Sequence, residues 1–256
     1  MGSNTSNTSN VPKLLERGKG KQNVNSKADN KVACNKLKVT NKTKYLKVGS
    51  WNIKRGFHAK ETEIVHIIKE NKLNILGLQE VDMIIDTECA PCISNHVTVL
   101  PILVNKKDKT RVMMLVNKAI SFKLRADLMS TKFQSIWIET EKMLICTFYR
   151  EWSKNELDNN QMTNIEIFSE QMRSASKLKK EILVMGDMNL CSNQWNTRNY
   201  KHKKISDVVK ATLAECGYTH VDLGITYIAD HPSRDGNIAK SALDHAYVIT
   251  KKQNYV

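Results

Sequence analysis

The chain contains no apolar stretch that approaches the roughly 20 residues needed for a membrane-spanning helix. Its N-terminus is polar and lacks the apolar middle region of a secretion signal, so we expect an intracellular protein, nuclear or cytoplasmic and not secreted. The six cysteines are scattered along 256 residues, and a chain of this length does not need a disulfide framework. This cysteine usage favours a reducing compartment.

Two short motifs are weak signals. Cys89 and Cys92 have the spacing of a redox motif or of half a zinc site, but no second Cys or His pair lies at a suitable distance. The first residues match the pattern for myristoylation of Gly2. Patterns this short often match by accident, so we interpret the cysteine pair as part of a loop and assign no modification to Gly2.

Acidic residues are outnumbered, with 26 Asp and Glu against 40 Lys and Arg and a formal net charge of +14. This balance predicts a polyanionic partner, either nucleic acid or an acidic membrane surface, although solubility alone would also account for it. Apolar residues make up 41% of the chain, which is enough for a core in one large domain or two small ones.

Residues 1–44 differ in composition from the rest of the chain. They are rich in Ser, Asn and Lys and have few large apolar side chains, so burial cannot offset the entropy of ordering them. We predict a disordered basic tail here, followed by a folded domain over 45–256. Such a tail would bind phosphate backbones without sequence preference and in a salt-dependent way. A solvated linker without a ligand is the alternative.

From residue 45 onward, the apolar spacing alternates between that of strands and that of helices, as in an α/β fold. Helical spacing is found over 61–70, 165–178 and 205–213, and Gly217 closes the third segment. No internal repeat is visible. Strands are predicted over 45–49, 74–79, 97–104, 111–117, 135–140, 143–149, 182–185, 219–223 and 243–250.

The most informative motif is Gly186-Asp187-Met188-Asn189, which ends the apolar run 182–185. Alternation along an extended backbone places Asp187 and Asn189 on the same side of the sheet. An acid and an amide in this arrangement can hold and activate a water next to a metal-bound phosphate. The same pattern also occurs in ordinary turns, so the motif gains its meaning from its companions.

Polar side chains follow three other predicted strands. Asn52 could donate its amide to a phosphate oxygen, or it could cap a turn. Glu80 at a strand end would be unfavourable unless solvated or bound to a cation, and a carboxylate suits Mg²⁺; an exposed Glu is the alternative. Tyr149 could donate to a phosphate oxygen, with Arg150 beside it as a second phosphate contact, or it could be half-buried at a sheet edge.

These motifs, in this order and together with Phe148–Trp152 and Ser241–Tyr247, resemble the endonuclease/exonuclease/phosphatase superfamily, whose fold is like that of DNase I. The resemblance extends from about residue 45 to 249 and is greatest to the apurinic-type endonuclease domains of non-LTR retrotransposons. It implies an α/β sandwich of two sheets flanked by helices. It also implies Mg²⁺, with Mn²⁺ as a substitute, held by Glu80.

The resemblance further assigns catalytic roles. Asp187 would orient or deprotonate the attacking water and Asn189 would hold the scissile phosphate, with Asn52 and Tyr149 as further phosphate contacts. Products would carry a 5′-phosphate and a 3′-hydroxyl. Asp244, which enters the last strand, would orient a catalytic His from a later Ser-Asp-His motif.

Two departures from the family pattern affect the expected activity. Lys54 stands where related apurinic-site enzymes carry an acid, and the Ser-Asp-His motif is missing because the chain ends at Val256. His245 cannot replace the missing His, since adjacent strand residues point to opposite faces. We therefore expect a domain without its last strand or strands, with an open sheet edge and activity lowered by about a hundredfold or more.

The segment 228–240 resembles a projecting hairpin that enters the DNA minor groove in retrotransposon endonucleases. Arg234 and Lys240 would then contact the groove or its phosphates, with a plain surface loop as the alternative.

The leading hypothesis is a Mg²⁺-dependent phosphodiesterase that nicks DNA for target-primed reverse transcription. Element RNA would bind the basic tail, and a reverse transcriptase domain is expected in the parent element but is absent from this chain. The alternatives are a catalytically inactive nucleic-acid-binding remnant and a phosphatase of the same fold.

Overall fold

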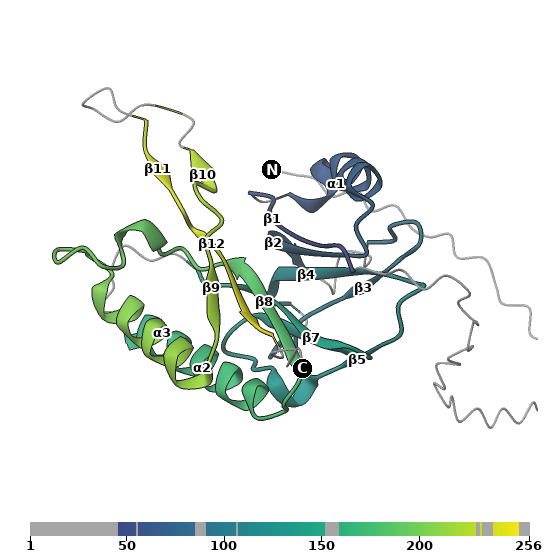
Figure 1. Ribbon diagram of the computed structural model, residues 1–256. Coiled ribbons are helices and arrows are strands. Elements are labelled where there is room, and N and C mark those ends of the chain that lie inside the picture. The colour runs from purple at the N-terminus through teal and green to yellow at the C-terminus, as the bar shows by residue number, and fades with distance from the viewer. Residues whose placement is uncertain are drawn as a thin grey trace, which may run out of the picture. The chain divides into compact units, whose positions relative to one another are not determined.

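Two β-sheets lie face to face at the centre of the protein, and helices cover their outer faces (Figure 1). The computed structural model describes residues 46–54, 56–84, 91–105, 107–151, 159–228, 231 and 238–250, all within the unit that spans 39–256. The predicted basic tail, Gly2, Cys89 and Arg234 lie outside the described residues. None of the helices in the described part is long and apolar enough to cross a membrane.

The first sheet has four strands in the order β1-β2-β4-β3. β1 runs parallel to β2, whereas β4 is antiparallel to both of its neighbours. Helix α1, Phe57–Asn71, connects β1 to β2 and covers the outer face with Phe57, Ile64 and Ile68. The strands are β1 Val48–Asn52, β2 Ile75–Ile84, β3 His96–Val99 and β4 Lys109–Asn117.

The second sheet has six strands in the order β5-β6-β7-β8-β12-β9. β7 and β8 are parallel and are joined through helix α2, Asn159–Ser176, while the other neighbours are antiparallel. The short strands β10 and β11 form a hairpin that projects from the sandwich (Figure 1). The strands are β5 Phe122–Leu124, β6 Ser135–Thr140, β7 Met143–Tyr149, β8 Glu181–Asp187, β9 Thr219–Val221, β10 Tyr227–Ile228, β11 Lys240–Ser241 and β12 Asp244–Ile249.

Alternation along the strands divides the apolar residues between separate cores. Ile145 of β7 and Met185 of β8 face the first sheet, where they pack with Met114 of β4. Phe148 faces the other way, and its ring lies 4.6 Å from that of Phe168 on α2. Because the central strands β4, β7 and β8 are buried on both faces over most of their length, they read as nearly continuous apolar runs.

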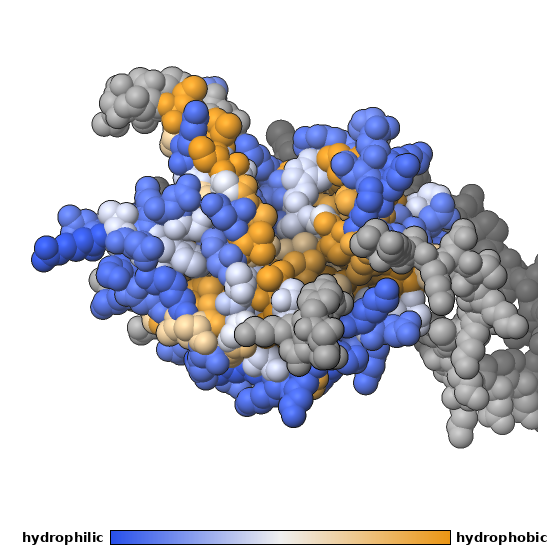
Figure 2. All heavy atoms as spheres, in the orientation of Figure 1, coloured by the Kyte–Doolittle hydropathy of each residue, from blue (hydrophilic) through white to orange (hydrophobic). Residues whose placement is uncertain are grey.

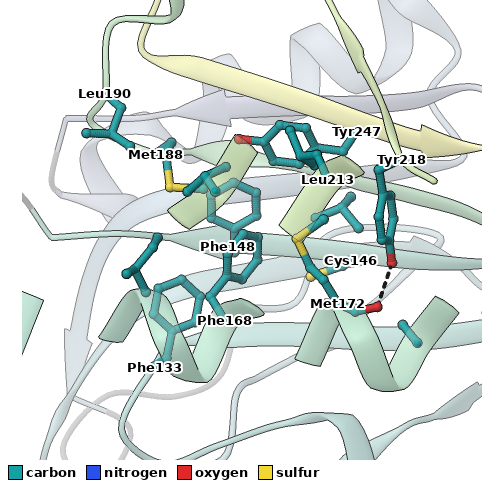
Figure 3. Close-up of a cluster of buried hydrophobic side chains, with 14 of the residues drawn as sticks. Phe133, Cys146, Phe148, Phe168, Met172, Met188, Leu190, Leu213, Tyr218 and Tyr247 are labelled. Atoms are coloured by element: carbon teal, nitrogen blue, oxygen red, sulfur yellow. Dashed lines mark hydrogen bonds between the residues drawn. The ribbon is translucent and has the colours of Figure 1, made fainter. Parts of the chain in front are cut away.

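The outer core of the six-stranded sheet is the largest of these clusters (Figure 3). Helix α3, Lys203–Cys216, presents Ile205, Val209 and Leu213 to it, at the i, i+4 spacing of one helix face. The helix ends at Gly217, whose φ of 74° lies in the left-handed region typical of a helix terminus. The Tyr218 hydroxyl that follows donates to the Met172 carbonyl of α2 at 3.1 Å.

The structure confirms the predicted α/β sandwich of two sheets and corrects some of its details. The last described strand, β12, lies between β8 and β9 and is therefore not itself an edge of its sheet. Among the described strands of the first sheet, β1 lies at an edge and pairs only with β2. The strand predicted over 74–79 continues to Ile84 through a bulge in which Glu80 and Asp82 both have φ of 54°.

Candidate active site

Strand register brings the predicted site residues together at one side of the sandwich. Asp187 at the end of β8 is paired with Tyr149 at the end of β7 and with Asp244 at the start of β12. Asn52 ends β1 beside the bulge of β2 that carries Glu80. A cavity of about 660 Å³ is lined by both sheets, and its polar residues include Asn52, Glu80, Asp187, Asn189 and Asp244.

The same cavity continues away from the acids as an apolar groove. Val48 of β1 lies on one side, and Leu183, Met185 and Ala246 lie on the other. A band of apolar residues is visible in the hollow between the β1 and β12 sides of the protein (Figure 2).

Asn52 connects the acids of the two sheets. Its Nδ2 donates to Glu80 Oε1 at 3.1 Å and to Asp187 Oδ2 at 2.8 Å. Its Oδ1 accepts a bond from the Lys54 backbone N–H at 2.9 Å, which fixes the orientation of the carboxamide. The donor side of the amide therefore points into the site.

Asp187 is only 4% exposed, and this burial raises the pKa of its carboxyl group to about 7. The negative charges of Asp244 and Glu80 raise the pKa further, whereas the bonds donated by Asn189 and Asn52 oppose the shift. Asp244 is partly buried, and the loss of solvation raises the pKa of its own carboxyl group. The site thus holds a carboxyl group that can take up or release a proton near neutral pH.

Tyr149 and Glu80 form a second contact between the sheets. The Tyr149 hydroxyl donates to Glu80 Oε1 at 3.1 Å, and burial followed by the Glu80 charge raises the pKa of the phenol. The hydroxyl remains protonated at neutral pH and can therefore serve as a hydrogen-bond donor.

Arg111 is part of this contact and is not identified by the sequence analysis. Its Nη2 donates to the Tyr149 hydroxyl at 3.2 Å, and its guanidinium carbon lies 4.8 Å from the centre of the Tyr149 ring. It also forms ion pairs with Asp82 and Glu151. Since a guanidinium cannot accept a hydrogen bond, the Tyr149 proton must point elsewhere, toward Glu80. No local sequence signal marks Arg111, which lies on β4, 38 residues from Tyr149.

Arg150 corrects a sequence-based prediction. The expected phosphate or DNA contact is wrong for this conformation, because the residue is 2% exposed and its guanidinium points into the protein. It donates to the carbonyls of Met188 and Asn189 and to Gln161 Oε1 on α2. Burial lowers the pKa of Arg150 to about 10, so it stays cationic at neutral pH.

Asn189 lines the cavity just beyond β8 and has φ of 52°, a left-handed backbone that asparagine tolerates better than most residues. Its Nδ2 donates to the Arg150 carbonyl at 2.8 Å, and its backbone N–H donates to Asp187 Oδ1 at 2.7 Å. Positive φ at both Asn189 and Glu80 is the kind of backbone strain that collects at functional sites.

Asp244 and His245 point to opposite faces, as strand alternation predicts. His245 is the one histidine among the described residues that line the cavity, and its side chain is fully buried in the outer core. Its Nε2 lies 2.7 Å from the Leu190 carbonyl oxygen and its Nδ1 lies 2.8 Å from the Tyr247 hydroxyl. Burial lowers the pKa of His245 to about 3, so this imidazole is neutral and turned away from the acids.

The hairpin of β10 and β11 borders the same cavity. Tyr227 lines it, and the Lys54 ammonium lies 5.4 Å from the centre of the Tyr227 ring. Lys240 is exposed on β11 and is paired with Ile228 of β10. Arg234 lies outside the described residues.

The acids fit a magnesium ion better than a metal that needs several protein ligands. Within the described residues, no group of three or more His, Cys, Asp or Glu side chains is placed to hold a metal. Mg²⁺ keeps waters and uses one or two carboxylates together with substrate phosphate. The mutual repulsion of Glu80, Asp187 and Asp244, which contributes to the raised pKa of Asp187, is what a cation held by Glu80 would relieve.

A two-sheet α/β sandwich with acids and amides gathered at the ends of its strands is the architecture of the DNase I-like class. The sequence profile of the endonuclease/exonuclease/phosphatase family matches residues 49–248, and the chain belongs to this family. No curated protein sequence is similar enough to count as a match.

Solved structures with the same fold include DNA-processing enzymes. The endonuclease domain of TRAS1, a telomere-specific non-LTR retrotransposon, is 17% identical, with a TM-score of 0.58 over 79% of this chain and 84% of that one. The 3′ phosphatase NExo from Neisseria, bound to a product DNA hairpin, is 15% identical, with a TM-score of 0.60 over 80% and 86%. An AP endonuclease from Archaeoglobus fulgidus is 13% identical, with a TM-score of 0.56 over 80% and 86%. At these identities the likeness shows the fold alone.

Proposed function

We propose that this protein is a Mg²⁺-dependent phosphodiesterase that nicks DNA. The observation that carries the proposal is the bridge made by Asn52, whose Nδ2 donates to both Glu80 and Asp187 across the two sheets. This bridge places an acid suited to Mg²⁺ and an acid suited to proton transfer around one amide.

The residues divide the reaction between them. Asp187 holds the attacking water through its carboxylate and takes up the proton as the water oxygen bonds to phosphorus. The bond between phosphorus and O3′ breaks, and O3′ takes up a proton from solvent water, which leaves a 5′-phosphate and a 3′-hydroxyl. The negative charge of Asp244 raises the pKa of Asp187 and makes it a stronger base.

Donors around the cavity stabilise the phosphate as its charge develops. The amides of Asn52 and Asn189 line the cavity, while the Tyr149 hydroxyl donates a hydrogen bond to Glu80 that Arg111 keeps directed that way. Glu80 would hold the Mg²⁺ or Mn²⁺ ion, which when bound neutralises phosphate charge.

The hairpin of β10 and β11 supports DNA as the substrate. Ile228 and Ile238 are exposed by 55% and 52%, and Ile228 is paired with Lys240 across the hairpin and so shares its face. Apolar side chains next to a cation are typical of hairpins that enter the minor groove. Together with the fold shared with the TRAS1 endonuclease domain, this favours a retrotransposon-type endonuclease for target-primed reverse transcription.

Nicking of supercoiled plasmid with Mg²⁺ tests the proposal, with EDTA and Asp187→Ala as negative controls. Asp207→Ala is the matched variant, because Asp207 is a half-exposed acid on α3 that pairs with Lys203 away from the site. We expect nicking by the wild type and Asp207→Ala only.

Other outcomes identify the alternatives. Folded protein that releases phosphate from a 3′-phosphorylated oligonucleotide without nicking would be a phosphatase of the same fold. Folded protein that binds DNA and does neither would be an inactive nucleic-acid-binding remnant. Either result overturns the proposed function.

A further inference from the structure

Arg150 makes an unusual set of contacts for a residue next to a candidate catalytic strand. Its backbone N–H donates to the Asp187 carbonyl at 2.9 Å, and its backbone carbonyl accepts from Asn189 Nδ2 at 2.8 Å. Its Nε donates to the Met188 carbonyl at 2.7 Å, and its Nη2 donates to the Asn189 carbonyl at 3.1 Å. One residue thus contacts Asp187, which ends β8, and the two residues that follow it.

A buried arginine needs partners for its donors, because an unpaired charge in the protein interior is strongly unfavourable. Here the partners are backbone carbonyls and Gln161 Oε1, which lies 2.5 Å from Nη1. No carboxylate is hydrogen-bonded to the Arg150 guanidinium in the described part of the chain. A hydrophobic residue of similar length would pack here without this desolvation penalty, so the fixed fork of donors is the property that distinguishes arginine.

The carbonyls that Arg150 binds belong to a segment with a strained backbone. Asn189 adopts φ of 52°, and its N–H must stay directed at Asp187 Oδ1 for the acid to keep its orientation. Left-handed backbone at a residue other than glycine persists only where its surroundings hold it. The Arg150 fork fixes the carbonyl on either side of the Asn189 nitrogen, while Gln161 ties the fork to α2.

We infer that Arg150 is a positioning residue for Asp187 and Asn189, and that it acts through the backbone of 187–189 rather than through DNA. The inference rests on the proposed phosphodiesterase function for its kinetic test. It predicts that loss of the fork lowers the rate of the chemical step and leaves DNA affinity intact.

The test compares Arg150→Met and Arg150→Lys in the full chain, with Arg173→Met as the matched control. Arg173 is a partly exposed arginine of α2. It forms an ion pair with Glu215 of α3 and not with the residues at the end of β8. Arg150→Met should lower kcat by about a hundredfold, since misplacement by about 1 Å has an effect of that size, with KM for DNA nearly unchanged. Arg150→Lys, which keeps the charge and loses the fork, should restore only part of kcat. Arg173→Met should match the wild type.

If Arg150 instead contacted DNA, its substitution would change KM and leave kcat unchanged. A raised KM with unchanged kcat, or a smaller salt dependence of binding in Arg150→Met, overturns the inference. If Arg150→Met does not fold, Gln161→Leu takes its place, because it removes one partner of the fork; unchanged kcat in a folded Gln161→Leu also overturns the inference.

Amide hydrogen exchange separates this inference from the proposed function. Exchange at the Asn189 amide should accelerate in Arg150→Met while amides inside β7 keep their protection. Equal protection of Asn189 in the two proteins overturns the positioning role even if the wild type proves not to nick DNA. Faster exchange in a protein without nicking activity supports the positioning role and rejects the proposed function.

Discussion

Asn52 and Asp187 are 135 residues apart in the chain and are joined by a hydrogen bond of 2.8 Å from Nδ2 to Oδ2. The bond connects the last residue of β1 in one sheet to the last residue of β8 in the other. It exists only because the sheets pack face to face at this end.

Asn52→Ala removes this bond and the bond to Glu80. Loss of a donor aimed at developing charge should lower the nicking rate by about 10²–10³-fold. Asn71→Ala is the control, because Asn71 donates only to a helix carbonyl in an exposed position. If the nicking rate of Asn52→Ala lies within about threefold of the wild-type rate, Asn52 has no role in the reaction.

The pH dependence of nicking follows from the raised pKa of Asp187. The carboxylate form is the base, so the rate should rise with pH up to about 7 and level off above it. A single-turnover pH profile at saturating Mg²⁺ checks this. A rate that is flat below neutral pH would contradict the role of Asp187 as base.

The same carboxyl group makes stability depend on pH. Its folded-state pKa of about 7 lies above the ordinary value of 3.8, so the folded protein holds this proton more tightly than the unfolded chain. Wild type should therefore lose stability relative to Asp187→Asn as pH rises from about 4 to about 7, by at most about 1.4 kcal/mol per pH unit, and no further above that range. Urea unfolding of both proteins across this range measures the difference.

Gly186 is required by the close approach of β8 to β7. A Cβ at this position would lie 2.0 Å from the Phe148 carbonyl oxygen, so Gly186→Ala should destabilise the protein by about 2–3 kcal/mol. Gly224→Ala is the control, because Gly224 has φ of 71° but a Cβ added there would have no atom within 4 Å. This substitution should lower the free energy of unfolding by about 1 kcal/mol. Equal losses in thermal unfolding would show that the contact with β7 is not decisive.

Arg111 and Asp82 should be energetically coupled. Their side chains are 16% and 12% exposed, with Nε 2.5 Å from Oδ1 in an ion pair. A double-mutant cycle with Arg111→Met and Asp82→Asn should give a coupling of about 1–3 kcal/mol. The exposed pair Lys60 and Glu63 provides the comparison and should give less than about 0.5 kcal/mol.

Lys240 on the hairpin should contribute to DNA binding through charge. In an Asp187→Asn background, Lys240→Ala should reduce the slope of log K against log salt by about 1. Lys177→Ala, which removes an exposed charge next to the C-terminal end of α2, should leave the slope unchanged. The same slope in both variants would place DNA away from the hairpin.

The sequence predicts the ends of β4, β6 and β7 correctly, because apolar runs and alternation are local properties of the chain, whereas the predicted ends of β1, β2 and β3 differ from those observed. Asp187 and Asn189 both reach the cavity from one strand end, and the helix predicted over 205–213 lies within Lys203–Cys216. The prediction that Glu80 stands at a strand end is less accurate, because β2 continues past Glu80 through a bulge that depends on pairing with β4.

Arg150 and Arg111 show where sequence reasoning fails. Arg150 follows a strand and carries a charge, which on its own indicates a surface contact, yet the packing of α2 and the end of β8 buries it. Arg111 has no distinctive neighbours in sequence, and its relation to Tyr149 arises only when β4 and β7 face each other across the sandwich. Burial of a charged residue depends on partners that are remote in sequence.

The sequence by itself determines the α/β class, the order of the strands that deliver polar side chains and the chemical types of those side chains. The tertiary structure alone decides which donor meets which acid, that the Asp187 carboxyl group is buried enough to titrate near neutral pH, and that Arg150 holds the backbone of the site. The reason is that hydrophobic periodicity acts over neighbouring residues, whereas desolvation and hydrogen-bond geometry depend on contacts between distant ones.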